Sequence, residues 1–334
     1  MITQRLNTDN LGIAAACEIL KNSGIVGIPT ETVYGLAASA YDPCAIAKIF
    51  EAKGRPQDNP LIVHIAKLDT LYEIASEVPD TALKLAQKFW PGPLTIVLSK
   101  NEKIPACVSA GLSTVAVRMP SHPIAREVIL QSGLPLAAPS ANISGSPSPT
   151  SANHVLTDLD GKINAVLMGN DCLVGVESTV ITLAGEHPVL LRPGGVTLEQ
   201  LREVLPDITV NKAVLSELEK GETAASPGMK YKHYAPKTEA YLVEGENFAD
   251  FVNQKSNACA VCFLEESEEI NLPKIVYGQK ENPKTLAQNI FAVLRKVDKL
   301  DVKEVYIHAP EKSGIGLAVY NRLIRAAAFK VIKL

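Results

Sequence analysis

The stretch IVGIPTETVYG, residues 25–35, passes from a short apolar run into a cluster of hydroxyl groups with one carboxylate. Residues 25–28 are apolar and rich in β-branched side chains, which predicts a strand. Thr30 and Thr32 follow directly, and ligands of open α/β sheets bind where strands end. From the residues alone two readings stay open, because these hydroxyls either cap a turn or contact a ligand.

The same alternation of apolar runs and helical periodicity continues through the first two hundred or so residues. It is typical of an α/β domain in which helices cover a sheet. The predicted strands are residues 25–28, 61–65, 94–98, 114–118, 165–168, 178–183 and 189–191. The predicted helices are residues 11–22, 44–52, 81–89, 123–131 and 198–204.

A chain of 334 residues exceeds the usual size of one hydrophobic core, so two domains are expected. The pattern changes over residues 212–238, where the run KYKHYAP at 230–236 is too aromatic for a passive linker and indicates a segment that docks. We predict a first domain at 1–211, a linker or lid at 212–238 and a second domain at 239–334.

Strands and helices alternate again in the second domain, which favours a small parallel sheet of Rossmann-like type. The predicted strands are residues 240–243, 258–264, 274–277 and 304–307, and the predicted helices are 285–300 and 317–327. Cys259 and Cys262 lie on one of these strands, where residues three apart point to opposite faces, so they are expected to be core side chains.

Composition is that of an ordinary globular protein, with 46% hydrophobic and 21% charged residues. A net charge of -3 argues against a protein that binds nucleic acid tightly. The first residues lack the blocks of a signal peptide, and no apolar run approaches the roughly 18 residues of a membrane span. We therefore expect a cytoplasmic protein that is not bound to a membrane.

The loop KGRPQDNP, residues 53–60, carries two cations beside a glycine and is stiffened by two prolines. Arg55 is suited to a bidentate phosphate contact and Lys53 to a point charge. Cations also favour the C-terminus of a helix, but that alternative explains Lys53 and not the proline-rich loop.

His64, Arg118 and Arg192 are polar residues at or near the ends of apolar strands. A lone histidine in an apolar strand is more often a core residue with satisfied hydrogen bonds than a reactive one, so both readings of His64 stay open. A cation at the end of an apolar strand, such as Arg118, requires an anion or a water-filled cleft. Residues 137–149 carry no long side chain, so a ligand could approach their backbone closely.

The common signatures of nucleotide, kinase, hydrolase and zinc sites are absent from the sequence. Other motifs lie at residues 29–35, 53–60, 90–95, 139–145, 177–179 and 192–194. On these motifs the chain resembles the threonylcarbamoyl-AMP synthase (YrdC-type) family over about residues 10–205. Residues 226–236 and the domain after them resemble the longer, two-domain form. This resemblance implies a YrdC-like open twisted α/β catalytic domain followed by a smaller Rossmann-like α/β domain.

The resemblance implies that L-threonine, bicarbonate and ATP give threonylcarbamoyl-AMP and pyrophosphate, the first step of a modification at the tRNA adenosine next to the anticodon. Magnesium would accompany ATP, and its protein ligands are not specified. The product would pass transiently to a tRNA threonylcarbamoyl transferase. We expect a monomer, and a reaction without a covalent protein nucleophile.

Motif by motif, the resemblance also assigns binding residues. Those implied for L-threonine are Thr32, His64, Arg118, Ala138 and Ser178. Those implied for ATP are Lys53, Arg55, Asn59, Thr114, Ser140, Ser148, Arg192 and Tyr234. Tyr234 would belong to a linker that folds over the pocket and excludes water.

Two other functions remain as alternatives. One is a carbamoyltransferase on the same fold, which the lack of zinc-finger and acylphosphatase-like segments disfavours. The other is an RNA-binding or ribosome-assembly module, whose affinity would fall steeply with salt and would not need threonine. A synthase requires threonine, bicarbonate and ATP together.

Overall fold

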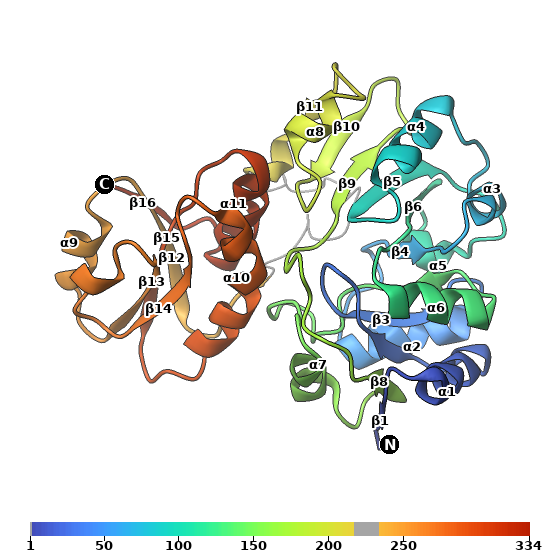
Figure 1. The fold of residues 1–334 in the computed structure, drawn as a ribbon, viewed down its shortest axis with the longest axis horizontal. Helices are drawn as coiled ribbons and strands as arrows, with labels where there is room; N and C mark the ends of the chain where they lie inside the picture. The colour runs from blue at the N-terminus through green and yellow to red at the C-terminus, as the bar shows by residue number, and fades with distance from the viewer. Residues whose placement is uncertain (1, 217–233) are drawn as a thin grey trace.

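The computed structural model describes residues 2–216 and 234–334, which form two α/β units (Figure 1). The first unit is built on an 11-stranded sheet with the order β1-β8-β2-β3-β7-β4-β6-β5-β9-β10-β11, and the second on a 5-stranded sheet with the order β14-β13-β15-β12-β16. Most of the predicted linker, residues 217–233, lies outside the described residues.

The strands of the first sheet are β1 (Gln4–Leu6), β2 (Val26–Ile28), β3 (Gly35–Ser39), β4 (Ile62–His64), β5 (Leu94–Ser99), β6 (Thr114–Arg118), β7 (Leu136–Ala137), β8 (Ala165–Leu167), β9 (Thr179–Thr182), β10 (Val189–Arg192) and β11 (Thr209–Val210). The helices of this unit are α1 (Asn10–Lys21), α2 (Pro43–Lys53), α3 (Asp69–Ile74), α4 (Asp80–Phe89), α5 (Ala106–Ser109), α6 (Pro123–Ser132), α7 (Ala152–Leu159) and α8 (Leu198–Arg202).

The first sheet mixes parallel and antiparallel pairs. Strand β4 runs parallel to β6, β5 runs antiparallel to β6 and parallel to β9, and β9 runs antiparallel to β10. The C-terminal ends of β4, β6 and β10 therefore lie at the same edge of the sheet as the N-terminal end of β9. This edge receives polar side chains from several strands.

Strand β3 was not predicted from the sequence. It consists of GLAAS, all buried, and it pairs antiparallel with β2. Small residues buried on both faces give neither the alternation nor the β-branched run by which a strand is recognised. Residues 29–34 therefore connect two adjacent strands.

Local signals account for the helix boundaries. The side chain of Asp42 accepts a hydrogen bond from the Cys44 amide, Pro43 is the first residue of α2, and Gly54 ends the helix in the left-handed conformation. This stop directs the chain away from the helix axis, so that Arg55 leaves α2 toward the sheet edge.

The second unit contains β12 (Glu239–Glu244), β13 (Ala258–Phe263), β14 (Lys274–Gly278), β15 (Glu304–His308) and β16 (Val331–Lys333), with α9 (Phe248–Asn253), α10 (Pro283–Val297) and α11 (Gly314–Ala326). All strand pairs in this sheet are parallel, which confirms the predicted arrangement. Cys259 and Cys262 are buried in different apolar clusters, as expected for opposite faces of one strand.

Helices α10 and α11 lie between the second sheet and the first unit (Figure 1). Arg295 of α10 makes a two-point contact with Asp158 of α7, at 2.9 and 2.8 Å, and Arg322 of α11 reaches Glu177 in the first unit. The two units are thus joined through buried charges. No helix in the described part of the chain is long and apolar enough to cross a membrane.

We predict that Ile96→Ala lowers the free energy of unfolding by about 2–5 kcal/mol. Ile96 is fully buried in β5 at the centre of the larger core, and the truncation leaves a cavity there. Leu11→Ala on α1 is the control, because Leu11 is 83% exposed, and it should change stability by less than about 0.5 kcal/mol. Chemical denaturation followed by circular dichroism measures both, and equal losses would contradict the assignment of the core.

Candidate active site

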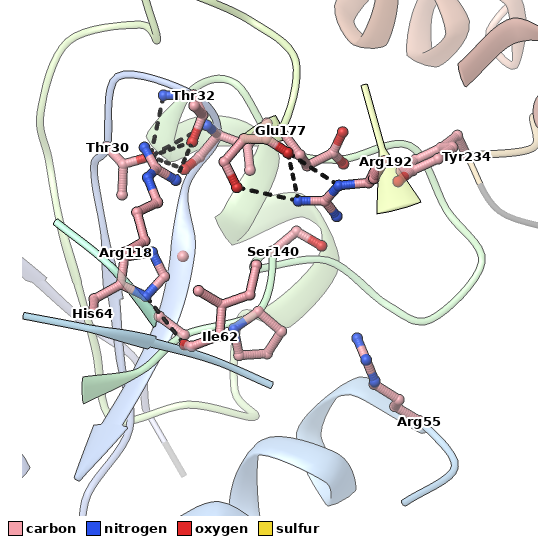
Figure 2. A pocket seen from close by; sticks show the side chains of 15 residues that line it. Thr30, Thr32, Arg55, Ile62, His64, Arg118, Ser140, Glu177, Arg192 and Tyr234 are labelled. Atoms are coloured by element: carbon pink, nitrogen blue, oxygen red, sulfur yellow. Dashed lines mark hydrogen bonds between the residues drawn. The ribbon is translucent and has the colours of Figure 1, made fainter. Parts of the chain in front are cut away.

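A pocket opens at the edge of the first sheet where the polar strand ends meet. His64 and Arg118 are the last residues of parallel strands and are register partners. Ser178 directly precedes β9, and Arg192 ends the antiparallel neighbour β10. Figure 2 shows His64 and Arg118 on one side of this pocket and Arg192 with Tyr234 on the opposite side, with Arg55 apart from both pairs.

Arg118 is buried and is held by three groups. Its Nη2 lies 2.6 Å from Glu31 Oε1, its Nη1 donates to Thr32 Oγ1 at 2.9 Å, and its Nε donates to the Gly92 carbonyl at 3.2 Å. Thr30 Oγ1 lies 2.9 Å from Thr32 Oγ1 and fixes it from the other side. Burial alone would raise the pKa of Glu31, but Arg118 lowers it, so the carboxylate stays ionised.

His64 is buried beside this arginine. Its Nδ1 lies 3.2 Å from the Ile62 carbonyl, which favours the tautomer with the proton on Nδ1. Burial, and then the charge of Arg118, lower the pKa of His64 to about 3. His64 is therefore neutral near pH 7 and offers the pocket a hydrogen-bonding group without a charge.

The opposite wall is built around Arg192. Its Nε and Nη2 donate to the Ser178 carbonyl at 3.1 and 2.9 Å, and Nη2 also donates to Ser178 Oγ at 3.2 Å. Ser178 Oγ in turn lies 2.8 Å from Thr95 Oγ1. Burial lowers the pKa of Arg192 only to about 10, so it carries its charge at neutral pH.

Two further residues complete the pocket from outside the sheet. Nη2 of Arg55 donates to the carbonyls of Asn59 and Pro60 at 3.2 and 3.3 Å, and burial lowers the pKa of Arg55 to about 10. Tyr234 is buried, and the next residue, Ala235, donates its amide to the Gly145 carbonyl at 3.0 Å. The end of the predicted linker thus returns to the first domain at the pocket.

The structure brings most of the sequence-predicted residues together. Those that line the pocket are Thr32, His64, Arg118, Ala138 and Ser178 of the threonine set, and Arg55, Ser140, Arg192 and Tyr234 of the ATP set. Those of the ATP set that do not line it are Lys53, Asn59, Thr114 and Ser148.

Lys53 has a different place from the one its charge suggested. It is buried, and its Nζ donates to the carbonyls of Ser140 and Asn142 at 2.5 and 2.6 Å. Burial, and then the charge of Arg55, hold its pKa well below the usual value. Lys53 therefore anchors the small-residue loop that forms one wall, and its contact with ATP stays a prediction.

The other three lie around the pocket. Asn59 contributes its carbonyl to Arg55, and Ser148 donates to Glu177 Oε1 at 2.6 Å. Thr114 begins β6, four residues before Arg118, so about 13 Å of extended strand separates them. Their contacts with ATP also stay predictions.

Glu177 lines the pocket and was not selected from the sequence. It is buried between Ser148 and Arg322, and these partners together with Arg192 lower its pKa although burial alone would raise it. A single signal pointed to it: a carboxylate beside apolar Val176, directly before a strand, needs a buried cation. Its partner lies 145 positions away, so no local pattern reveals it.

Comparisons with known proteins identify relatives over the whole chain. The protein family described as "Telomere recombination" matches residues 18–194, and the one described as "Threonylcarbamoyl-AMP synthase, C-terminal domain" matches residues 196–328. The threonylcarbamoyl-AMP synthase of Pyrococcus abyssi (strain GE5 / Orsay) is 45% identical, over 100% of this chain and 99% of its own. That of Bacillus subtilis (strain 168) is 43% identical, over 99% and 97%. A crystal structure of P. abyssi Sua5 complexed with L-threonine matches with a TM-score of 0.91 and 41% identity, covering 100% of both chains.

The low pKa of His64 predicts a pH dependence of stability. The folded state takes up this proton only near pH 3, whereas the unfolded chain takes it up near pH 6.5, so the contribution of His64 is complete above about 6.5 and is lost as the pH falls. Between pH 6 and 4, His64→Gln should reduce the slope of unfolding free energy against pH by up to about 1.4 kcal/mol per unit. Denaturant unfolding at several pH values measures this, and an unchanged slope would mean that His64 charges in the folded protein.

Proposed function

The chain belongs to the threonylcarbamoyl-AMP synthase family, and from that premise we propose that its pocket holds L-threonine and ATP next to each other through the residues described above. Enzymes of this family convert L-threonine, bicarbonate and ATP into threonylcarbamoyl-AMP and pyrophosphate for the modification of tRNA. The full-length relatives confirm the predicted synthase function. They give no support to the alternatives of an RNA-binding module or a carbamoyltransferase.

One observation carries the assignment of the pocket: two buried cationic groups, Arg118 and Arg192, face one cavity from opposite walls. A buried guanidinium needs an anionic or strongly hydrogen-bonding partner. Glu31 neutralises the charge of Arg118 in part. Arg192 shares the pocket lining with a second cation, Arg55. We assign the Arg118 side to the amino acid and the Arg192 side to the phosphates.

On the threonine side, the guanidinium of Arg118 would bind the carboxylate, because planar guanidinium and carboxylate groups match in geometry. The ionised carboxylate of Glu31 lies on the same arginine and favours a cationic group nearby, such as the threonine ammonium. Hydroxyls of Thr32 and Ser178 would orient the substrate. The P. abyssi relative was crystallised with L-threonine, which supports this assignment.

His64 is a poor candidate for the base that deprotonates the threonine amine. An efficient general base has a pKa near the working pH, and the pKa of His64 is about 3. We therefore infer that His64 positions the substrate through a hydrogen bond. Once neutral, the amine captures bicarbonate or carbon dioxide as a carbamate, and a carbamate oxygen attacks the α-phosphorus while pyrophosphate leaves.

On the ATP side, the buried Arg192 and the half-buried Arg55 remain charged at neutral pH. They would offset the charge that develops on the leaving pyrophosphate. This stabilisation is strong because the two guanidinium groups are already in place and need not reorient during the reaction. The reaction needs no covalent protein nucleophile. Positioning of three reactants and charge balance account for catalysis.

Magnesium is proposed to enter with ATP. In the described residues no cluster of three or more His, Cys, Asp or Glu side chains could hold a metal ion. Glu177, which lines the pocket, is paired with Arg322, and Glu31 is paired with the pocket residue Arg118. Magnesium is commonly bound through substrate phosphates, so the nucleotide would supply its main ligands.

We also propose that the first domain ends at residue 211 and that the second begins after residue 238. The protein would be a cytoplasmic monomer that passes its product transiently to a tRNA threonylcarbamoyl transferase. Tyr234 lines the pocket and the next residue, Ala235, donates to the Gly145 carbonyl, which supports Tyr234 as part of a cover. Residues 217–233 of the predicted linker lie outside the described residues. A cover would protect the mixed anhydride of the product from water.

Pyrophosphate release tests the proposed function. The purified protein with ATP, magnesium and bicarbonate should release pyrophosphate only when L-threonine is present, and serine should be a much poorer substrate. Mass spectrometry should detect threonylcarbamoyl-AMP. Release that does not depend on threonine would refute the assignment.

Arg55→Ala should reduce kcat on the order of 100-fold, because it removes one of the charges that face the phosphates. Its thermal midpoint should stay close to that of the parent, since Arg55 is only half-buried and donates to two backbone carbonyls. Arg5→Ala on the exposed strand β1 is the matched control and should leave both quantities unchanged. Unfolding of Arg55→Ala at assay temperature would make Arg55 a structural residue.

A further inference from the structure

Arg322 of helix α11 is fully buried, with 0% of its surface exposed. Burying a guanidinium group is costly unless all of its donors are paired. Its Nε donates to Glu177 Oε2 at 2.8 Å, and its Nη1 donates to the Pro193 carbonyl and to Asn321 Oδ1, both at 2.8 Å. Two of these three acceptors belong to the other domain.

The acceptors of Arg322 adjoin residues of the pocket. Glu177 directly precedes Ser178, and Pro193 directly follows Arg192. Nη2 of Arg322 also lies 3.5 Å from the Glu177 carbonyl, in hydrogen-bonding geometry. One side chain of the second domain therefore holds both loops that present Ser178 and Arg192 to the ligand.

These loops are also fixed to each other, so a shift in one displaces the other. Arg192 donates twice to the Ser178 carbonyl, and Gly194 packs directly on the backbone of the facing loop. A Cβ atom at Gly194 would lie 2.3 Å from the Thr179 amide nitrogen and 2.4 Å from the Glu177 carbonyl oxygen. The two loops are therefore held against each other, and Arg322 bonds to both.

The same arginine lies behind the tyrosine that covers the pocket. Its guanidinium carbon is 5.9 Å from the centre of the Tyr234 ring, in cation-π range. The ring centre of Phe291 in α10 lies 5.2 Å from the same point. Tyr234 is thus supported by α10 and α11. Both halves of this wall, the paired loops and the tyrosine, depend on side chains of the second domain.

We propose that Arg322 is a positioning residue for the reaction in the first domain, acting through Glu177 and the Pro193 carbonyl on Ser178 and Arg192. The inference rests on the proposed roles of those two residues in binding threonine and ATP. The second domain then has a defined function: it completes the geometry of an active site whose substrates bind to the first domain.

A matched control exists in the other buried arginine pair between the domains. Arg295 contacts Asp158 of α7 at 2.9 and 2.8 Å, and Asp158 does not line the pocket. Asp158→Asn removes the charge from this pair and leaves the loops at Glu177 and Pro193 in place. Arg322→Gln removes the charge and part of the bonding from the pair under study.

Both variants and the parent are compared as full-length proteins at a temperature well below their thermal midpoints. Pyrophosphate release is measured at varied concentrations of L-threonine and ATP, and L-threonine affinity is measured by calorimetry. Arg322→Gln should lower kcat/KM on the order of 100-fold, the loss typical of misplaced reactants, and weaken threonine binding. Arg322→Lys keeps the charge but cannot reach both acceptors, so its kcat/KM should lie between those of the parent and of Arg322→Gln. Asp158→Asn should stay within about threefold of the parent, since neither Asp158 nor Arg295 bonds to the loops at Glu177 and Pro193.

Equal losses in Arg322→Gln and Asp158→Asn, in proportion to their thermal midpoints, would overturn the proposal and make Arg322 a docking contact alone. So would an Arg322→Gln enzyme within threefold of an active parent. If Arg322→Gln does not fold, Arg322→Lys carries the same comparison. A parent that releases no pyrophosphate would count against the proposed function, and threonine affinity in the variants would still decide whether Arg322 positions the pocket.

Discussion

The structure depends on buried arginines that are balanced by the protein at the edge of one sheet. Arg118 is paired with Glu31 on one wall of the pocket, and Arg192 bonds the Ser178 carbonyl on the other. Arg322 pairs with Glu177 behind that wall. Removing Glu31 or Glu177 would leave an uncompensated buried charge, which costs far more than the net stability of an intact pair. Under the proposed function, the same charges would recognise the carboxylate of threonine and the phosphates of ATP.

Charged side chains also join the two domains. The first sheet supplies the ligand-facing groups, while α10 and α11 supply Arg295 and Arg322, whose partners lie in the first domain. The interface is therefore part of the polar framework of the site and not a simple apolar contact. A catalytic pocket made by one domain can in this way be tuned by residues of the next.

Much of this was predictable from the sequence. Apolar runs and helix signals located most strands and helices, and the motifs identified most of the polar side chains that line the pocket. Strand β3 escaped because GLAAS is short, small and buried on both faces. Lys53 could not be placed because its charge fits a phosphate and a pair of carbonyls equally well, and only the fold shows which is adjacent. Glu177 and Arg322 form a contact across 145 positions, which no local pattern encodes.

The most direct test of the central claim is a calorimetric comparison of L-threonine with threoninol, its analogue without the carboxylate. We expect one threonine site per chain, no measurable threoninol binding, and loss of threonine binding in Arg118→Gln at a temperature where this variant is shown to be folded. Threoninol binding as tightly as threonine, or unchanged threonine binding in Arg118→Gln, would contradict the claim that buried guanidinium groups at the sheet edge recognise the substrate through its negative charge.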